Sequence, residues 1–287
     1  MIATLPQSVR LRLRHRARTR WRDPVLIVAA LVGVGLVVMV IAAPWLAPEA
    51  PQQTNILAPN APASAQHLLG TDALGRDLLS RLMYGGRLSL LAPALVVVIA
   101  TTVGTALAVS AAWFGGAFDS SVTRVMNILF SFPSLILAVL AVAAFGSGVV
   151  APVLALSVAY IPYVGRVARS LALRERNLPY VEALVLAGVP TWKICAGHIT
   201  ANLLPVIRAQ ALIAFGSALV DFGAISFLGL GVQPPTAEWG LMVADGRSAL
   251  LSGTPQESLY AGGFIVLTVV ALNVVGERLA ARAEMSR

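Results

Sequence analysis

Lysine and histidine are the first residues to consider for chemistry in this chain, and their spacing argues against the usual sites. Lys193 is the only lysine, and the glycines and hydroxyl residue of a phosphate-binding loop do not surround it. His15, His67 and His198 form no local ligand pair such as His-x-x-x-His. We therefore expect no nucleotide held by such a loop and no metal in this chain, so ATP-driven work would need another polypeptide.

A serine nucleophile and cysteine chemistry are equally poorly supported. Ser147 lies in Gly146-Ser147-Gly148, inside a long uncharged stretch without histidine or lysine to act as its base. A turn between two helices explains these glycines better than a membrane-embedded hydrolase does. Cys195 is the only cysteine, which excludes an intrachain disulfide and a two-cysteine metal site.

Arg208 and Asp221 are ionisable residues within an otherwise apolar stretch, residues 203–224. Such residues can line a transport pathway. They are thirteen residues apart, roughly 20 Å along a helix at 1.5 Å per residue, so they cannot pair in a straight helix. The alternative, which we favour from the sequence, is that each side chain reaches toward its own end of the span. A pathway role stays open.

The composition identifies the environment of these residues as a membrane. The chain is 57% hydrophobic and 12% charged, with a mean hydropathy of +0.81, whereas soluble domains carry roughly 25% charged residues. The net charge of +8 does not indicate nucleic-acid binding, because the cations flank apolar runs instead of forming a basic patch with interleaved aromatic residues.

Uncharged runs predict an all-α membrane protein with six spans. A spanning helix needs about 20 apolar residues, and runs of this length without alternation are helices. The uncharged run from 125 to 165 is long enough for two spans, which we divide at Gly146-Ser147-Gly148. The predicted spans are residues 25–47, 88–113, 125–145, 149–167, 203–224 and 259–276. The first is too long for the core of a secretory signal, so we read it as uncleaved.

The distribution of cations predicts the orientation. Six spans place both termini and the connections 2–3 and 4–5 on one side, which receives sixteen of the 21 cations. The opposite side receives Arg76, Arg81, Arg87 and Arg247. Because cytoplasmic loops carry the excess of Lys and Arg, we expect both termini in the cytoplasm.

Two external segments and one cytoplasmic segment carry recognisable patterns. Residues 48–66 are a Pro- and Ala-rich connector, and residues 70–86 predict a short helix beginning at Thr71 or Asp72. Residues 226–258 form a long outer loop that we expect to be ordered. In the cytoplasm, Pro179 favours a helix start, while Gly188 and Pro190 favour its end. Val181, Leu184 and Val185 form an apolar stripe on this helix, which could enter a groove or rest on lipid headgroups.

The cytoplasmic segment resembles a motif of the membrane subunits of ABC importers, Glu-Ala-Ala followed by three residues and Gly. Here it reads Glu182-Ala183-Leu184-Val185-Leu186-Ala187-Gly188, with Leu at the third position. Downstream, His198-Ile199-Thr200-Ala201-Asn202 stands where the family usually has His-Ile-Leu-Pro-Asn. The resemblance implies a coupling helix over residues 179–192 that sits in a groove of the ATPase subunit. The implied contact residues are Tyr180, Val181, Glu182, Ala183, Leu184 and Gly188.

Two external motifs resemble the C-type permease subunit of dipeptide, oligopeptide and nickel importers. The first runs from His67 to Arg81 and contains Gly70, Thr71, Asp72, Gly75, Arg76 and Asp77. The second contains Ser226, Phe227, Leu228, Gly229, Gly231, Gln233, Pro234, Pro235, Trp239 and Gly240. Together with the spans, the resemblance covers nearly all of the chain after its basic arm.

The resemblance implies a bacterial cell-membrane permease with a defined set of partners. These are a paired B-type permease, two ATP-binding domains (separate or fused) that use ATP and Mg²⁺, an extracytoplasmic substrate-binding protein and membrane lipid. The chain itself would carry no cofactor and no catalysis. The substrate would be a di- or oligopeptide, a nickel chelate or haem. A secondary transporter driven by an ion gradient, with Asp221 as the carrier, is the alternative from another class; the absence of an internal repeat disfavours it.

The implied organisation has five parts. Residues 1–24 are a basic arm, 25–47 the first span, 48–86 the external connector with its short helix, 87–277 a type-1 permease domain and 278–287 a cytoplasmic tail.

Overall fold

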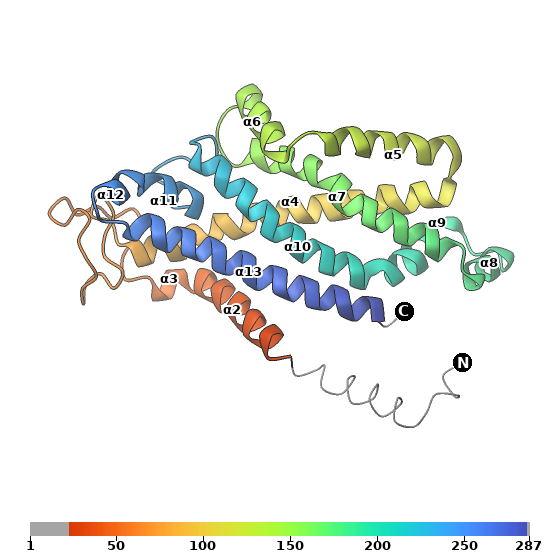
Figure 1. Ribbon diagram of the computed structural model, residues 1–287, viewed down its shortest axis with the longest axis horizontal. Helices are drawn as coiled ribbons and strands as arrows, with labels where there is room; N and C mark the ends of the chain where they lie inside the picture. Colours follow the sequence, from red (N-terminus) through yellow and green to blue (C-terminus); the bar gives the residue numbers. More distant parts are fainter. Residues whose placement is uncertain (1–22, 286–287) are drawn as a thin grey trace.

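The computed structural model describes residues 23–285, and these form an elongated bundle of helices (Figure 1). Within residues 23–285, five helices are long and apolar enough to cross a membrane: Pro24–Ile41, Leu78–Phe114, Val150–Arg176, Thr191–Phe227 and Gln256–Ala283. A sixth crossing is possible if the bent pair Gly116–Ser131 and Ser134–Phe145 counts as one span. The basic arm lies outside the described residues except for its last positions.

Helix α2 (Pro24–Ile41) begins at a cap that the sequence contains. The side chain of Asp23 accepts a hydrogen bond from Val25 N at 3.1 Å, and Pro24 occupies the first turn, where a missing N–H costs nothing. The helix ends earlier than expected, at Ile41, and the one-turn helix α3 (Ala43–Leu46) completes the predicted first span. Helix α2 lies beside α13 (Gln256–Met285), where Asp23 pairs with Arg278 at 2.9 Å.

The expected short external helix beginning at Thr71 or Asp72 is wrong. Residues 70–77 form turns in which Gly70 and Gly75 have φ of 82° and 73°. The helix starts only at Leu78, where Asp77 caps it by accepting from Ser80 N at 2.8 Å. It then continues without a break into the second span, as α4 (Leu78–Phe114). Gly70 and Gly75 adopt left-handed backbone conformations, which a helix before Asp77 could not contain. After Asp77 no residue of α4 has such a conformation, so the helix runs on into the span.

The third predicted span is not one straight helix. Helices α5 (Gly116–Ser131) and α6 (Ser134–Phe145) meet at an angle of 85°. The break lies at Phe132, whose backbone is extended (φ −91°, ψ 130°) because Pro133 follows it. The turn predicted at Gly146-Ser147-Gly148 is confirmed, since α6 ends at Phe145 and α7 begins at Val150, with Gly146 and Gly148 at positive φ.

Besides α4, three other membrane helices extend beyond their predicted spans. Helix α7 (Val150–Arg176) continues past residue 167, α10 (Thr200–Phe227) begins before residue 203, and α13 reaches Met285 through most of the predicted tail. Charged residues mark where a helix can leave hydrocarbon, but they do not end it. Before α10, the chain passes through the three-residue helix α9 (Thr191–Lys193) and a π-helix, η2 (Ile194–Ile199).

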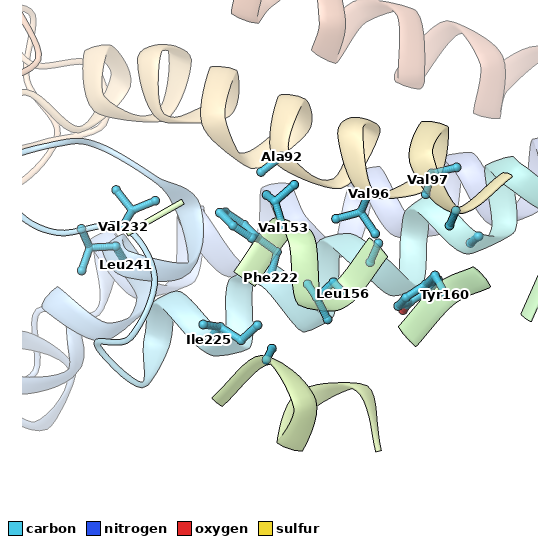
Figure 2. Packing of buried hydrophobic residues seen from close by; sticks show 14 residues of the cluster. Ala92, Val96, Val97, Val153, Leu156, Tyr160, Phe222, Ile225, Val232 and Leu241 are labelled. Carbon is cyan, nitrogen blue, oxygen red and sulfur yellow. The ribbon is translucent and has the colours of Figure 1, made fainter. Parts of the chain in front are cut away.

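The core is formed where α4, α7 and α10 pack together (Figure 2). Ala92 and Val96 of α4 face Leu156 of α7 and Phe222 of α10, all at most 2% exposed. Val232 and Leu241, from the segment after α10, close one end of this cluster. A second cluster at the other end joins the same three helices to the segment after α7.

Candidate functional site

The motif from Glu182 to Gly188 begins in a separate helix, α8 (Pro179–Leu186), at the end of the molecule farthest from α11 and α12 (Figure 1). It is shorter than the expected residues 179–192. Gly188 has φ of +74°, Gly188 N bonds to Val185 O at 3.0 Å, and Val189 N bonds to Leu184 O at 3.0 Å. This pair of bonds is the Schellman ending of a helix, which needs a left-handed residue. Gly188 is therefore required by the turn.

Two of the three residues in the predicted apolar stripe of α8, Val181 and Leu184, face the protein, whereas the third, Val185, is exposed. Val181 is 2% exposed and packs with the second core cluster, and Leu184 packs against the same cluster. The face that remains accessible carries Glu182 and Ala183, together with Val185 and Leu186. Leu186 is 82% exposed, and its side chain was not among the predicted contact residues. Of that predicted set, Val181 cannot contact a partner in this conformation.

The first external motif builds a compact turn structure on α4. Asp72 Oδ1 accepts from Leu74 N at 2.8 Å and from Arg76 N at 2.9 Å. Thr71 Oγ1 donates to Ala58 O and accepts from Ala61 N, which anchors the preceding connector. A side chain at Gly70 or Gly75 would collide with the backbone of that connector. The motif residues are thus explained by packing within the chain.

The outer loop that holds the second external motif, residues 226–258, is ordered, as expected, and contains two short helices, α11 (Trp239–Asp245) and α12 (Arg247–Leu251). Trp239 is fully buried and donates from Nε1 to Leu82 O at 2.9 Å. Glu238 is fully buried at the start of α11, where its carboxylate accepts from Gly240 N (3.0 Å) and Leu241 N (2.8 Å). Burial raises the pKa of Glu238. Ser89 Oγ of α4 donates to Glu238 Oε1 at 2.8 Å.

Buried charge joins the first external motif to α11 and to the start of α13. Arg81 of α4 is fully buried and approaches Asp72 (3.3 Å), Asp245 (3.6 Å) and Glu257 (4.0 Å). Desolvation by burial raises the pKa of Asp245. We call Asp72, Arg81, Asp245 and Glu257 the external cluster. Asp72 was among the predicted site residues and Arg81 ended the first external motif. Asp245 and Glu257 belonged to neither motif, because they meet Arg81 across segments far apart in sequence.

Asp221 has partners on two other helices. Its Oδ2 accepts from Ser134 Oγ of α6 at 2.7 Å and from Tyr160 OH of α7 at 3.0 Å. The expectation that Asp221 simply reaches toward the end of its span is therefore wrong, because its carboxylate is held where three helices meet. Arg208 is exposed on α10. A pathway role for these two residues stays a prediction.

Known proteins resemble this chain over most of its length. The profile of the family "Binding-protein-dependent transport system inner membrane component" matches residues 100–284. A probable D,D-dipeptide transport system permease protein of Escherichia coli K12 is 38% identical over 89% of this chain and 85% of its own. A di/tripeptide transport system permease protein of Pseudomonas aeruginosa is 40% identical over 83% of this chain and 80% of its own length. A glutathione transport system permease protein of Pectobacterium atrosepticum is 34% identical over 97% of this chain and 94% of its own length.

Proposed function

Because this chain belongs to the family of inner membrane components of binding-protein-dependent transport systems, the permeases of ABC importers, we propose that it forms half of the translocation pathway for di- or tripeptides or a related small ligand such as glutathione. It is a multi-pass protein of the bacterial inner membrane. The names of its relatives support the peptide class of substrate. The same names disfavour a secondary transporter driven by an ion gradient.

The exposed face of α8 is the single observation that supports coupling to ATPase subunits. A short helix that presents Glu182, Val185 and Leu186 to solvent, while Val181 anchors it, has the form of a docking element. We place this face in a groove of an ATP-binding domain, where ATP and Mg²⁺ are held by that partner. A second permease would complete the pathway, and a binding protein would deliver substrate at the opposite end, which carries the external cluster.

The test is uptake by the complete complex in proteoliposomes: both permeases, the ATP-binding subunits and the binding protein. We expect uptake of radiolabelled dialanine, trialanine or glutathione that requires ATP and survives ionophores that collapse ion gradients. Glu182→Lys should reduce uptake and co-purification of the ATP-binding subunits at least tenfold, because it reverses a charge on the docking face. Glu277→Lys is the matched control, since Glu277 is also exposed but lies on α13. Equal behaviour of the two variants would contradict the docking role of α8.

A further inference from the structure

The backbone around α8 is poorly suited to transmit a displacement. On one side, the extended residue Leu178 separates α8 from α7. On the other, the path to α10 runs through Gly188 at φ +74°, Pro190, the three-residue helix α9 and the π-helix η2. Interrupted helices and π-turns are places where a chain can flex or hinge. A movement of α8 that depended on the backbone alone would be partly absorbed there.

Three side chains bypass this path and join α8 directly to two membrane helices. Glu175 in the last turn of α7 accepts at Oε1 from Tyr180 OH of α8 at 2.8 Å. The same oxygen accepts from Asn202 Nδ2 of α10 at 2.7 Å. Asn202 Nδ2 also lies 3.1 Å from Tyr180 OH. We call Glu175, Tyr180 and Asn202 the clasp.

The surroundings of the clasp make it stiff. The acceptor Glu175 is only 9% exposed, and hydrogen bonds from neutral donors to a carboxylate are stronger where water is excluded, whereas the donor Asn202 is exposed. Desolvation is the larger cause, and the hydrogen bond to Glu175 the smaller one, that together raise the pKa of Tyr180 to about 12. The Tyr180 hydroxyl is therefore protonated at neutral pH and can donate a hydrogen bond. Beside the clasp, Val181 packs with Ala172 of α7 and Leu203 of α10. Apolar packing and the polar contacts therefore hold the same three elements.

We propose that Glu175 is a positioning residue: with Tyr180 and Asn202 it makes α8, the end of α7 and the start of α10 one rigid body, so that displacement of α8 by ATPase closure moves both membrane helices. This inference rests on the proposed docking role of α8. It adds the route by which the movement leaves that helix. Residues that never contact the ATPase thereby determine how much transport each ATP produces.

The first experiment measures coupling in the complete complex in proteoliposomes, as dialanine taken up per ATP hydrolysed. Glu175→Ala should lower this ratio at least tenfold while ATP hydrolysis changes less than threefold. Tyr180→Phe, which removes only one hydroxyl, should lower the uptake per ATP to a smaller degree. This milder variant keeps the test valid if Glu175→Ala fails to fold. Glu175→Gln keeps an acceptor at Oε1 and should stay within twofold of the wild type. A proportional loss of uptake and hydrolysis, or an unchanged ratio in both damaging variants, would overturn the proposal.

The second experiment does not depend on substrate. Spin labels at Ala187→Cys, the C-cap residue of α8 and outside its docking face, and at Val220→Cys on α10, in a Cys195→Ser background, report the distance between the two helices in the complex. Both sites are exposed. The wild-type clasp should give one narrow distance distribution that is the same without nucleotide and with ATP and vanadate. Glu175→Ala should broaden it. A nucleotide-dependent distance in the wild type, or an unbroadened one in the variant, would refute the rigid body.

Failure of the clasp and failure of the docking role can be told apart. If Glu182→Lys leaves the ATP-binding subunits attached, the docking role is wrong. If Glu182→Lys detaches them but Glu175→Ala preserves both coupling and the narrow distance, only the clasp is wrong.

Discussion

Individual polar residues in this chain act mainly as tethers between segments that are distant in sequence. Asp72 organises its own turn and also approaches Arg81, while Glu238 joins the start of α11 to Ser89 of α4. Asp221 does the same within the bundle, through the hydroxyls of Ser134 and Tyr160. A buried carboxylate of this kind is stable only when its hydrogen-bond partners are present. The role of each of these carboxylates therefore depends on the residues that surround it in the folded protein.

Glu238 should make stability depend on pH. Burial raises its folded-state pKa above the usual 4.5, so the folded protein binds this proton more tightly than the unfolded chain does. The stabilisation is present below pH 4.5 and is lost as the pH rises through the folded-state pKa. Glu238→Gln should therefore flatten the fall of Tm with pH above 4.5 in the purified complex. The substitution should also lower the free energy of unfolding by about 1 kcal/mol at every pH, because Leu241 N–H loses its acceptor. The Tm should fall accordingly.

The control for this pH series is Glu277→Gln, which removes an exposed carboxylate. Its Tm profile should follow that of the wild type. Parallel profiles for Glu238→Gln and the wild type would show that the buried carboxyl does not titrate differently in the folded state.

Helices α4 and α7 pack closely against each other at two glycines, Gly104 and Gly165. A methyl group added at Gly104 of α4 would lie 2.8 Å from Ile161 O and 3.2 Å from Gly165 N of α7. Neither obstacle is the movable end of a side chain, so the helices themselves would have to separate. Small residues at helix crossings allow this contact in membrane proteins.

Gly104→Ala should therefore destabilise the protein by about 1–3 kcal/mol, the usual effect of overpacking. Gly35→Ala is a matched control, because Gly35 lies inside α2 with no atom within 4 Å of the added methyl group. That variant should be neutral or slightly stabilising, since alanine favours a helix over glycine. Thermal unfolding in detergent, followed by loss of monodispersity, measures both. A Gly104→Ala protein as stable as Gly35→Ala would mean that the crossing is loose.

Across the whole molecule, single helices connect the end that carries α8 to the end that carries α11 and α12 (Figure 1). Helix α10 carries Asn202 of the clasp at its start and Ser226 of the second external motif near its end, about 36 Å apart at 1.5 Å per residue. Helix α4 carries Arg81 at one end and Ala112, which packs in the cluster around Val181, at the other. A rigid movement of α8 would thus reach the external cluster without passing through a loop.

This arrangement predicts opposite accessibility for the two ends in cells. With Cys195→Ser and without the ATP-binding subunits, Leu57→Cys (91% exposed) should react with a membrane-impermeant maleimide when the outer membrane alone is permeabilised. Leu186→Cys (82% exposed) should react only after the inner membrane is opened. Mass shift of the purified chain gives the readout. Reversed labelling would mean that α8 faces the periplasm, which excludes docking to a cytoplasmic ATPase.

The sequence alone determined the properties that follow from local composition. Uncharged runs predicted the spans, because each helix must bury its backbone polar groups within itself in lipid. Glycine and proline predicted the end of α8 and the turn before α7, because their backbone preferences act locally. The same reasoning failed for the bend at Phe132, although Pro133 was the available signal, and for the start of α4, whose cap at Asp77 was overlooked.

Only the tertiary structure decided which faces are buried and which distant residues meet. Val181 seemed suited to contact a partner, yet α7 and α10 cover it and leave Leu186 exposed instead. The clasp and the external cluster each join residues from three or more segments, and their geometry depends on the angles at which helices cross. Those angles arise from packing along whole helices, which no short stretch of sequence records.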